Sequence, residues 1–347
     1  MAMPKKLHSE LHDTARALVA DDKGILAADE SSGTIEKRFN SISLESTEES
    51  RRAYRDMLFT TPGLQEFVSG VILYDETLRQ SSTDGTPFAK LLSGKGIIPG
   101  IKVDTGAKDL AGAPGEKVTE GLDGLRERLE EYRGLGARFA KWRAVITIGD
   151  GIPTAYCIEA NAHALARYAA LCQEQGIVPI VEPEVLMDAD NDIATCYRAT
   201  KRTLHKTFDE LYHQRVDLEG ILLKPNMVLS GKGCATQANA DEVADWTLRC
   251  FRETVPAAVP GIVFLSGGQP DEQASENLNA INSLGPQPWV LSFSYGRALQ
   301  APALSAWGGS ADKVEAGQSF LALRARCNSA AVGGRYSAEM EELARSS

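Results

Sequence analysis

Eight short apolar segments recur along the chain, most of them separated by polar segments of helical character. Each apolar segment is rich in Val, Ile, Leu or Phe, the composition of a parallel strand that is buried on both faces. Eight strand–helix alternations without a break in composition favour one closed (β/α)8 barrel, the TIM-barrel class of α/β fold, over two open sheets. The expected strands are residues 24–29, 70–75, 97–104, 138–145, 177–184, 219–226, 261–268 and 288–296.

The helices between these strands are clearest at residues 159–175, 241–254 and 271–283. The first of them is Ala-rich and ends before Gly176, and the last opens with acidic residues in its first turn. The structural alternative is a doubly wound sheet, which is expected to carry a G-x-G-x-x-G turn after its first strand. This chain has DESSG there, so the barrel is favoured.

A chain of 347 residues is long enough for one barrel with a terminal extension. We expect residues 1–330 to form the barrel together with an N-terminal helix, and residues 331–347 to form a mobile polar tail.

The net charge of −10 argues against a general nucleic-acid binder. The chain lacks an apolar run of the ~20 residues that span a membrane, and its first residues, MAMPKKLHSELHD, resemble no signal or transit peptide. The six cysteines form no C-x-x-C pair, which indicates reduced thiols and a cytoplasmic protein.

Charged residues of both signs stand at nearly every expected strand end. One charge there is ordinary, because a strand must leave the core into water. Charges at nearly all of the strand ends are harder to explain in this way and indicate a functional site, because a barrel keeps its active site at the carboxyl ends of its strands. The set comprises Asp29, Asp75, Lys102 with Asp104, Lys141 with Arg143, Glu182 with Glu184, Lys224, Ser266 and Arg297.

Two pairs within this set have i, i+2 spacing, which places both members on one face of a strand. Lys141 and Arg143 form one pair, and Glu182 and Glu184 form the other. We expect both pairs to point into the barrel mouth, because paired charges buried against the outer helices would be expensive. Two neighbouring carboxylates repel, so one of them is expected to keep its proton and act as an acid. Lys141 is expected to lose affinity for its proton beside Arg143.

Lys224 follows three apolar residues and precedes Pro225. Apolar surroundings disfavour a charged amine, and a neutral amine can attack a carbonyl carbon. Lys102 and Lys141 are further candidates for this nucleophile, and composition alone gives Lys224 a modest lead.

Two anion sites are expected. Barrel enzymes often bind phosphate with the loops after strands 7 and 8, which here read LSGGQ (265–269) and SYGR (294–297). Glycine lets backbone N–H groups approach an anion, and arginine offers a bidentate fork, although both loops could be simple turns. LSGGQ also occurs in transporter ATPases, but this chain lacks a G-x-x-x-x-G-K-[ST] loop. The second site is the helix start at residues 31–34, with Lys37 and Arg38 one turn later, although an ordinary capped helix is an equal alternative for this segment.

The histidines give metal chemistry little support, because they lie outside the strand ends and no pair has the setting of a zinc site. They are His8, His12, His163, His205 and His213. A magnesium site built from carboxylates stays an alternative, but the lysines among the strand-end carboxylates favour a site without a metal. We expect neither metal nor cofactor.

Long segments of the chain resemble the class I fructose-bisphosphate aldolases. The matching runs are GILAADES (24–31), GVILYDETL (70–78), GIKVDTG (100–106), GLDGL (121–125), FAKWR (139–143), GIVPIVEPE (176–184), LEGILLKPNM (218–227), TVPAAVPGIVFLSGGQ (254–269), NLNAIN (277–282) and SFSYGRALQ (292–300). The resemblance implies cleavage of fructose 1,6-bisphosphate to dihydroxyacetone phosphate and glyceraldehyde 3-phosphate. It also implies a cytoplasmic homo-oligomer, commonly a tetramer.

The resemblance also implies roles for individual residues. Lys224 is similar to the lysine that forms a Schiff base with the C2 ketone, and Glu182 to the proton shuttle that Glu184 and Lys141 assist. Asp29 resembles the base that takes the C4 hydroxyl proton. The residues similar to the C1-phosphate site are Ser266, Gly267, Ser294, Gly296 and Arg297. Those similar to the C6-phosphate site are Ser31, Arg38, Lys102 and Arg143.

One feature departs from the family pattern. Animal members end in a tyrosine that reaches the active site, whereas this sequence ends in EELARSS and its last tyrosine is Tyr336. Tyr336 resembles an internal tyrosine of the family, so the resemblance assigns no catalytic tyrosine to the tail. Two alternatives stay open: another Schiff-base barrel such as a transaldolase or deoxyribose-phosphate aldolase, and an inactive scaffold barrel. Two phosphate sites favour the bisphosphate aldolase, because those rivals act on monophosphates.

Overall fold

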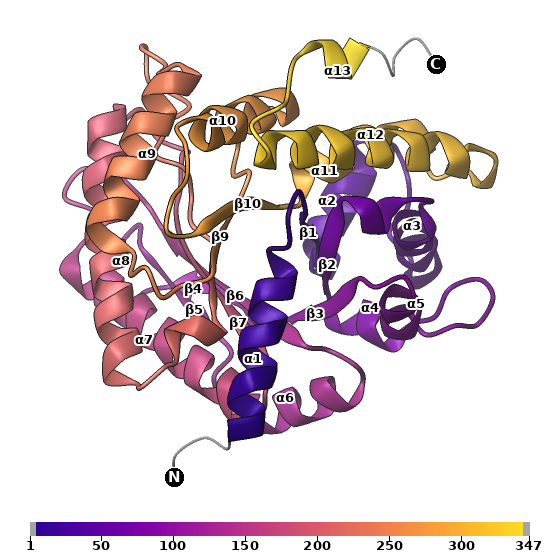
Figure 1. Cartoon of the computed structure of the whole chain (residues 1–347), viewed down its shortest axis with the longest axis horizontal. Coiled ribbons are helices and arrows are strands. Elements are labelled where there is room, and N and C mark those ends of the chain that lie inside the picture. Colours follow the sequence, from indigo (N-terminus) through magenta and orange to yellow (C-terminus); the bar gives the residue numbers. More distant parts are fainter. Residues whose placement is uncertain (1–4, 343–347) are drawn as a thin grey trace.

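The computed structural model describes residues 5–342, and its strands close into one parallel eight-stranded barrel. Each barrel strand pairs with the next barrel strand in the chain, and the last pairs with the first. Figure 1 shows the strands at the centre of the molecule. The barrel strands are β1 (Gly24–Ala28), β2 (Val68–Leu73), β3 (Ile98–Lys102), β6 (Phe139–Ile146), β7 (Val178–Val185), β8 (Leu222–Leu223), β9 (Gly261–Phe264) and β10 (Val290–Tyr295). All eight lie within the predicted segments, give or take two residues, so the predicted fold class is confirmed.

Helices surround the strands as an outer ring (Figure 1). They are α2 (Ser32–Asn40), α3 (Glu48–Thr60), α4 (Asp75–Arg79), α5 (Phe88–Gly94), α6 (Leu125–Gly134), α7 (Ala155–Glu174), α8 (Ile193–His213), α9 (Ala240–Thr254), α10 (Asp271–Ser283), α11 (Arg297–Trp307) and α12 (Val314–Val332). Short 3-10 turns are η1 (Leu64–Glu66), η2 (Leu218–Gly220) and η3 (Ala311–Lys313). The helices predicted at 159–175, 241–254 and 271–283 are confirmed as α7, α9 and α10.

The interior of the barrel is filled by side chains and closed at its amino end by α1 (Lys5–Leu18). Leu11, Ala15 and Leu18 of this helix pack against side chains that the strands point inward. The inward side chains of the lower layers are Ile25, Ala27, Ile72, Phe139, Val178, Ile180, Leu222 and Val263. Because side chains alternate along a strand, the next inward positions are two residues further on. There the inward face changes from apolar to charged, and this change creates the site.

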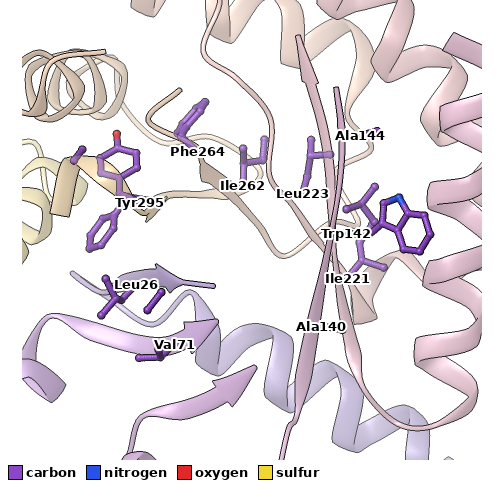
Figure 2. Packing of buried hydrophobic residues seen from close by; sticks show 14 of the residues in the cluster. Leu26, Val71, Ala140, Trp142, Ala144, Ile221, Leu223, Ile262, Phe264 and Tyr295 are labelled. Atoms are coloured by element: carbon purple, nitrogen blue, oxygen red, sulfur yellow. The ribbon is translucent and has the colours of Figure 1, made fainter. Parts of the chain in front are cut away.

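A second apolar layer lies between the strands and the helices. Trp142 is fully buried there and stacks on Tyr168 of α7, with ring centroids 5.6 Å apart. Figure 2 shows Trp142 on the helix side of its strand and Tyr295 at the end of β10. Trp142 is next to Lys141, and Tyr295 is next to Ser294, whose side chains point into the barrel. Because the two aromatic rings are packed in the outer layer, the neighbouring polar side chains are held in the inward direction.

Two features were not predicted from the sequence. The segment after β3 forms an antiparallel hairpin of β4 (Gly106–Asp109) and β5 (Lys117–Glu120), whose strands are short and mostly polar. The chain also ends its described part with a short helix, α13 (Glu339–Glu342). Within the expected tail, Glu341 is buried and forms an ion pair with Arg324 of α12, while residues 343–347 lie outside the described part.

The remaining global expectations concern cysteines and membranes. All six cysteines are free thiols, and Cys234 is half-buried while the others are buried. Within residues 5–342, none of the helices combines the length and the apolar character that crossing a bilayer requires.

Candidate active site

The residues to which the resemblance assigns a role all line one cavity of about 270 Å³ at the carboxyl end of the barrel. Asp75 and Asp104, the other members of the strand-end set, line a second cavity that shares Lys102 and Arg143 with the first. Its lining includes Asp29, Ser31, Arg38, Lys102, Lys141, Arg143, Glu182, Glu184, Lys224, Ser266, Gly267, Ser294, Gly296 and Arg297. Strand register explains the convergence, because Lys102 of β3 lies beside Lys141 of β6, and Arg143 lies beside Glu182 of β7. The cavity is therefore lined by every barrel strand except β2, directly or through the loop that follows.

Lys224 and Glu182 form the buried centre of this cavity. The Lys224 side chain follows the last residue of β8, and its Nζ lies 3.2 Å from Glu182 Oε1. Only 4 % of Lys224 and 3 % of Glu182 is exposed. The other carboxylate oxygen of Glu182 accepts no hydrogen bond within the described structure, although Lys141 Nζ lies 3.5 Å from it. The Glu182 carboxylate can therefore exchange a proton with the Lys224 amine through Oε1, while Oε2 stays buried beside Lys141.

Lys141 joins Asp29 to the same centre. Its Nζ lies 2.7 Å from Asp29 Oδ2, and both side chains are largely buried. Burial by itself would raise the pKa of Asp29, but the ammonium groups of Lys141 and Lys224 outweigh it and lower that pKa to about 2. Asp29 is therefore an anion at neutral pH, positioned to accept a proton.

The expectation that Lys141 loses affinity for its proton beside Arg143 is wrong. Burial would lower the pKa of Lys141, but the carboxylates of Asp29 and Glu182 outweigh burial and raise it above the ordinary lysine value. The sequence argument considered only the neighbour on the same strand. Asp29, which decides the charge of Lys141, comes from β1 on the other side of the barrel.

Each remaining charge of the upper layer has its own partner. Arg143 Nε donates to Glu184, and Lys102 Nζ donates to Asp104 Oδ1 at 2.6 Å. Burial would lower the pKa of Arg143, but the Glu184 carboxylate outweighs it and raises that pKa. The two predicted glutamates therefore differ, because Glu182 contacts lysines at the cavity floor and Glu184 pairs with an arginine nearer the rim.

One wall of the cavity is rich in groups that bind anions. Gly267 has a φ of +57°, a conformation that glycine adopts without strain, and it lies in the loop after β9. Arg297 begins α11 directly after Gly296, and its Nη2 donates to the Gln269 carbonyl at 3.0 Å. Ser294 Oγ is buried and has no hydrogen-bond partner among residues 5–342. A buried hydroxyl that lacks a partner within the protein is free to donate to a ligand.

A second wall of the cavity is formed by the start of α2 and by Arg38 of the same helix. Ser31 is the N-cap of α2, but its side chain makes no capping hydrogen bond. The Ser31 side chain therefore leaves the first N–H groups of this helix, which begins at the cavity, uncapped. The Arg38 guanidinium donates to Glu30, which is also an ion partner of Arg55. The helix start that the sequence predicted at Ser31 is confirmed.

Sequence reasoning missed the support of this second wall. Glu30 is buried, and its carboxylate accepts from Arg55 at 2.6 Å and from Gln300 Nε2 at 2.9 Å. Arg55 is on α3 and Gln300 is on α11, so neither stands at a strand end. The one available signal was the acidic residue next to Asp29 in DES. The strand-end criterion did not select it, because it lies one residue beyond the expected strand end at Asp29.

The carboxylates of the site are poorly suited to hold a metal ion. Asp29 contacts Lys141, Glu182 contacts Lys224, and Glu184 contacts Arg143. Each would have to give up a cationic partner before it could bind a cation. The arrangement is better suited to imine chemistry, in which a protonated lysine imine supplies the positive charge that a metal supplies elsewhere.

Comparisons with known proteins agree with this chemistry. Residues 10–347 match the family profile of class I fructose-bisphosphate aldolases. A probable fructose-bisphosphate aldolase class 1 from Xanthomonas campestris is 64 % identical over 298 residues, covering 86 % of this chain and 89 % of the relative. The cytosolic fructose-bisphosphate aldolase 4 of Arabidopsis thaliana is 50 % identical, covering 96 % of this chain and 85 % of the relative.

A solved structure shows the same fold. It is fructose-bisphosphate aldolase from Plasmodium falciparum in complex with TRAP and a small-molecule inhibitor. Its TM-score is 0.96 at 50 % identity, covering 97 % of this chain and 98 % of that one. The chain therefore belongs to the class I fructose-bisphosphate aldolases, metal-independent lyases that act on sugar phosphates through a lysine Schiff base.

Proposed function

We propose that Lys224 is the lysine that forms the Schiff base when this enzyme cleaves fructose 1,6-bisphosphate. The observation that carries the proposal is the 3.2 Å distance between Lys224 Nζ and Glu182 Oε1 in a cavity whose lining includes two groups of anion-binding residues. An ammonium group cannot attack a carbonyl, so it must first lose a proton. Glu182 is within hydrogen-bond reach and takes that proton.

Addition of the Lys224 amine to the C2 ketone forms a carbinolamine. Glu182 then returns a proton to the C2 hydroxyl group, which leaves as water and produces an iminium ion. The carboxylate oxygen of Glu182 that lacks a hydrogen bond has no competing partner during this proton transfer. Lys141 and Glu184 assist it by keeping the charges around Glu182 balanced.

Asp29 is the proposed base for carbon–carbon cleavage. It takes the proton from the C4 hydroxyl group, the C3–C4 bond breaks, and the electron pair moves to the iminium nitrogen to form an enamine. Because the pKa of Asp29 is about 2, the group is fully ionised when it is needed. Glyceraldehyde 3-phosphate leaves first. Protonation of the enamine and hydrolysis of the imine then release dihydroxyacetone phosphate and restore Lys224.

The two walls hold the two phosphates. We assign the C1 phosphate to the loops after β9 and β10, through Ser266, Gly267, Ser294, Gly296 and Arg297. The C6 phosphate is assigned to Ser31, Arg38, Lys102 and Arg143. Two separate anion sites favour a bisphosphate over the monophosphates of transaldolases and deoxyribose-phosphate aldolases. The reaction is a step of glycolysis, and its reverse serves gluconeogenesis.

A direct test is the cleavage rate with fructose 1,6-bisphosphate in the presence of EDTA, compared with fructose 1-phosphate and deoxyribose 5-phosphate. The proposal predicts that EDTA leaves the rate unchanged and that the bisphosphate has the highest kcat/KM. Preference for deoxyribose 5-phosphate would support the rival Schiff-base barrel. The absence of any cleavage would support the inactive scaffold.

The assembly and the compartment are a separate part of the proposal. We propose a cytoplasmic homotetramer, because family members are commonly tetramers and the Arabidopsis relative is named cytosolic. We also propose that residues 1–330 form the folded barrel and that residues 331–347 act as a tail. Light scattering during size-exclusion chromatography measures the assembly, and a monomer would contradict this part of the proposal.

A further inference from the structure

Two histidines and one aspartate meet at the amino end of the barrel, opposite the catalytic cavity. His8 and His12 lie one turn apart on α1, and Asp217 immediately precedes η2. Asp217 Oδ2 lies 3.3 Å from His8 Nε2 and 2.5 Å from His12 Nε2. Residues that are 205 positions apart thus place two imidazole nitrogens and a carboxylate oxygen around one point. Because only the fold brings Asp217 to the two histidines, this grouping could not be predicted from the sequence.

The spacing of these atoms suits a tetrahedral metal ion. With metal–ligand distances of about 2.0–2.1 Å, neighbouring ligand atoms in a tetrahedral site lie about 3.3 Å apart. The distance from Asp217 to His8 already has this value, 3.3 Å, and the three ligand atoms all lie within 4.8 Å of one another. The His12–Asp217 hydrogen bond would have to lengthen by under 1 Å, which a side-chain rotation supplies. A metal would replace the proton that these two groups share.

A second set of contacts supports the three groups from behind. Glu219 Oε2 lies 3.9 Å from Nδ1 of His12, the nitrogen that would face away from a metal. At 3.9 Å the two atoms are too far apart for a hydrogen bond. A rotation of the exposed Glu219 side chain would bring its carboxylate to the position that such groups take behind histidine ligands at zinc sites, where they orient the ring. Asp217 is fixed as well, since its Oδ1 accepts from the Glu219 backbone N–H at 3.2 Å.

The backbone of Asp217 is held by the body of the barrel. Gln173 of α7 accepts from the Asp217 N–H at 2.9 Å and donates to its carbonyl oxygen at 2.7 Å. The carboxylate therefore has a fixed position, whereas the two histidines move with α1. The side chains of His12 and Asp217 are 18 % and 19 % exposed and that of His8 is 44 % exposed, which leaves an open side for a fourth ligand such as water.

We propose that His8, His12 and Asp217 form a structural site for a late first-row divalent cation, of which Zn²⁺ is the best match. Imidazole nitrogens favour Zn²⁺, Co²⁺, Ni²⁺ and Cu²⁺, whereas Mg²⁺ and Ca²⁺ favour oxygen ligands. The ion binds α1 to the segment that leads into β8. Because α1 closes the amino end of the barrel, occupancy of the site stabilises this closure and takes no part in the aldol reaction.

Cobalt provides a direct probe, because tetrahedral Co²⁺ absorbs visible light whereas octahedral aqueous Co²⁺ absorbs weakly. The full chain is treated with EDTA, desalted and titrated with CoCl₂ at pH 7.5. We expect absorption between about 500 and 650 nm that saturates at one Co²⁺ per chain, and loss of that absorption on addition of ZnCl₂. The unfolding temperature should rise with ZnCl₂ and not with MgCl₂.

Variants locate the site. His12→Ala and Asp217→Asn should weaken Co²⁺ binding by more than about 100-fold, and Glu219→Gln by about 10-fold through loss of the supporting carboxylate. His163→Ala is the matched control, because His163 also lies beside a carboxylate, Glu210, at 3.2 Å but without a second histidine. That variant should bind Co²⁺ like the wild type. Circular dichroism of each variant checks that α1 and the barrel are intact.

Three outcomes would overturn the proposal: failure of the wild type to bind Co²⁺ at micromolar concentration, equal binding by wild type and His12→Ala, and absorption below 400 nm typical of a thiolate ligand. The last would place the metal on the half-buried Cys234. Aldolase activity measured in the same samples separates this proposal from the catalytic one. It should be the same with EDTA, Co²⁺ or Zn²⁺ at stoichiometric concentration.

Discussion

Glu30 supports the wall assigned to the C6 phosphate, and its replacement by glutamine tests the energetics of that support. The Glu30 carboxylate is an ion partner of Arg55, which is only 2 % exposed, and of Arg38, which lines the cavity. Glu30→Gln keeps the shape of the side chain but removes its charge. The Arg55 guanidinium then stays buried with a neutral partner, Gln300 Oε1 at 3.5 Å.

The expected cost follows from burial. Removing one partner of a buried ion pair costs about 3–5 kcal/mol in unfolding free energy, because the other charge stays buried without compensation. Arg51 provides a matched control, since it lies one turn before Arg55 on α3 and pairs with Glu76 at 2.6 Å. The side chains of Arg51 and Glu76 are 18 % and 26 % exposed. Glu76→Gln should therefore cost about 1 kcal/mol, closer to the value of surface pairs.

Urea unfolding at pH 7 and at pH 4 measures both effects. Burial raises the pKa of Glu30, but Arg38 and Arg55 outweigh it and lower that pKa below its ordinary value. A group whose pKa is lowered by folding stabilises the native state fully above its unfolded pKa, and this stabilisation is lost as the pH falls through the folded pKa. The difference between wild type and Glu30→Gln should therefore be largest at pH 7 and shrink in acid.

Kinetics give an independent measure of the same variant. Because Arg38 loses its anchor, kcat/KM for fructose 1,6-bisphosphate should fall by about 10-fold, which corresponds to about 1.4 kcal/mol. The value for fructose 1-phosphate should change little. Equal stability losses for Glu30→Gln and Glu76→Gln, or equal kinetic losses with both substrates, would refute the reasoning.

Three further substitutions test other parts of the account. Asp29→Asn should lower kcat by about 10²- to 10⁴-fold, because the base is lost. An adduct with dihydroxyacetone phosphate should still be trapped by borohydride and detected by mass spectrometry. Loss of this adduct as well would contradict the role assigned to Asp29. Ser294→Ala should leave the urea midpoint unchanged, because Ser294 Oγ has no partner among the described residues. It should raise KM by about 10- to 100-fold, the value of one hydrogen bond to a charged group, and an unchanged KM would remove Ser294 from the phosphate site. Gly100→Ala should lower the free energy of unfolding in urea by about 1–3 kcal/mol, since the added Cβ would lie 2.3 Å from Phe139 Cζ. Gly94→Ala is the control. Its added Cβ meets nothing within 4 Å, so its free energy of unfolding should not change.

The sequence predicted the barrel because its strands are buried on both faces and therefore read as continuous apolar runs. Even β8, only Leu222–Leu223 in length, was found, because Ile221 extends its apolar run and Lys224 marks its end. The hairpin of β4 and β5 was missed for the opposite reason. Its residues are mostly polar and partly exposed, so they carry no strand signal.

The cavity lining was predictable because a charged side chain at the end of a buried strand can reach either the barrel mouth or solvent and little else. Partner choice was not predictable, since it depends on contacts between distant segments. Lys141 keeps its proton because of Asp29, which directly follows β1. Glu30 is anchored by Arg55 and Gln300 on two helices. The His8–His12–Asp217 cluster likewise exists only after α1 has packed against the barrel.

The central claim is that Lys224 carries the substrate, and trapping of the imine tests it most directly. The protein is incubated with fructose 1,6-bisphosphate in EDTA, reduced with borohydride, digested and analysed by peptide mass spectrometry. The account predicts a reduced sugar-phosphate adduct on the peptide that contains Lys224, with activity unaffected by EDTA. An adduct on Lys141 or Lys102 instead, or the absence of an adduct together with loss of activity in EDTA, would contradict it.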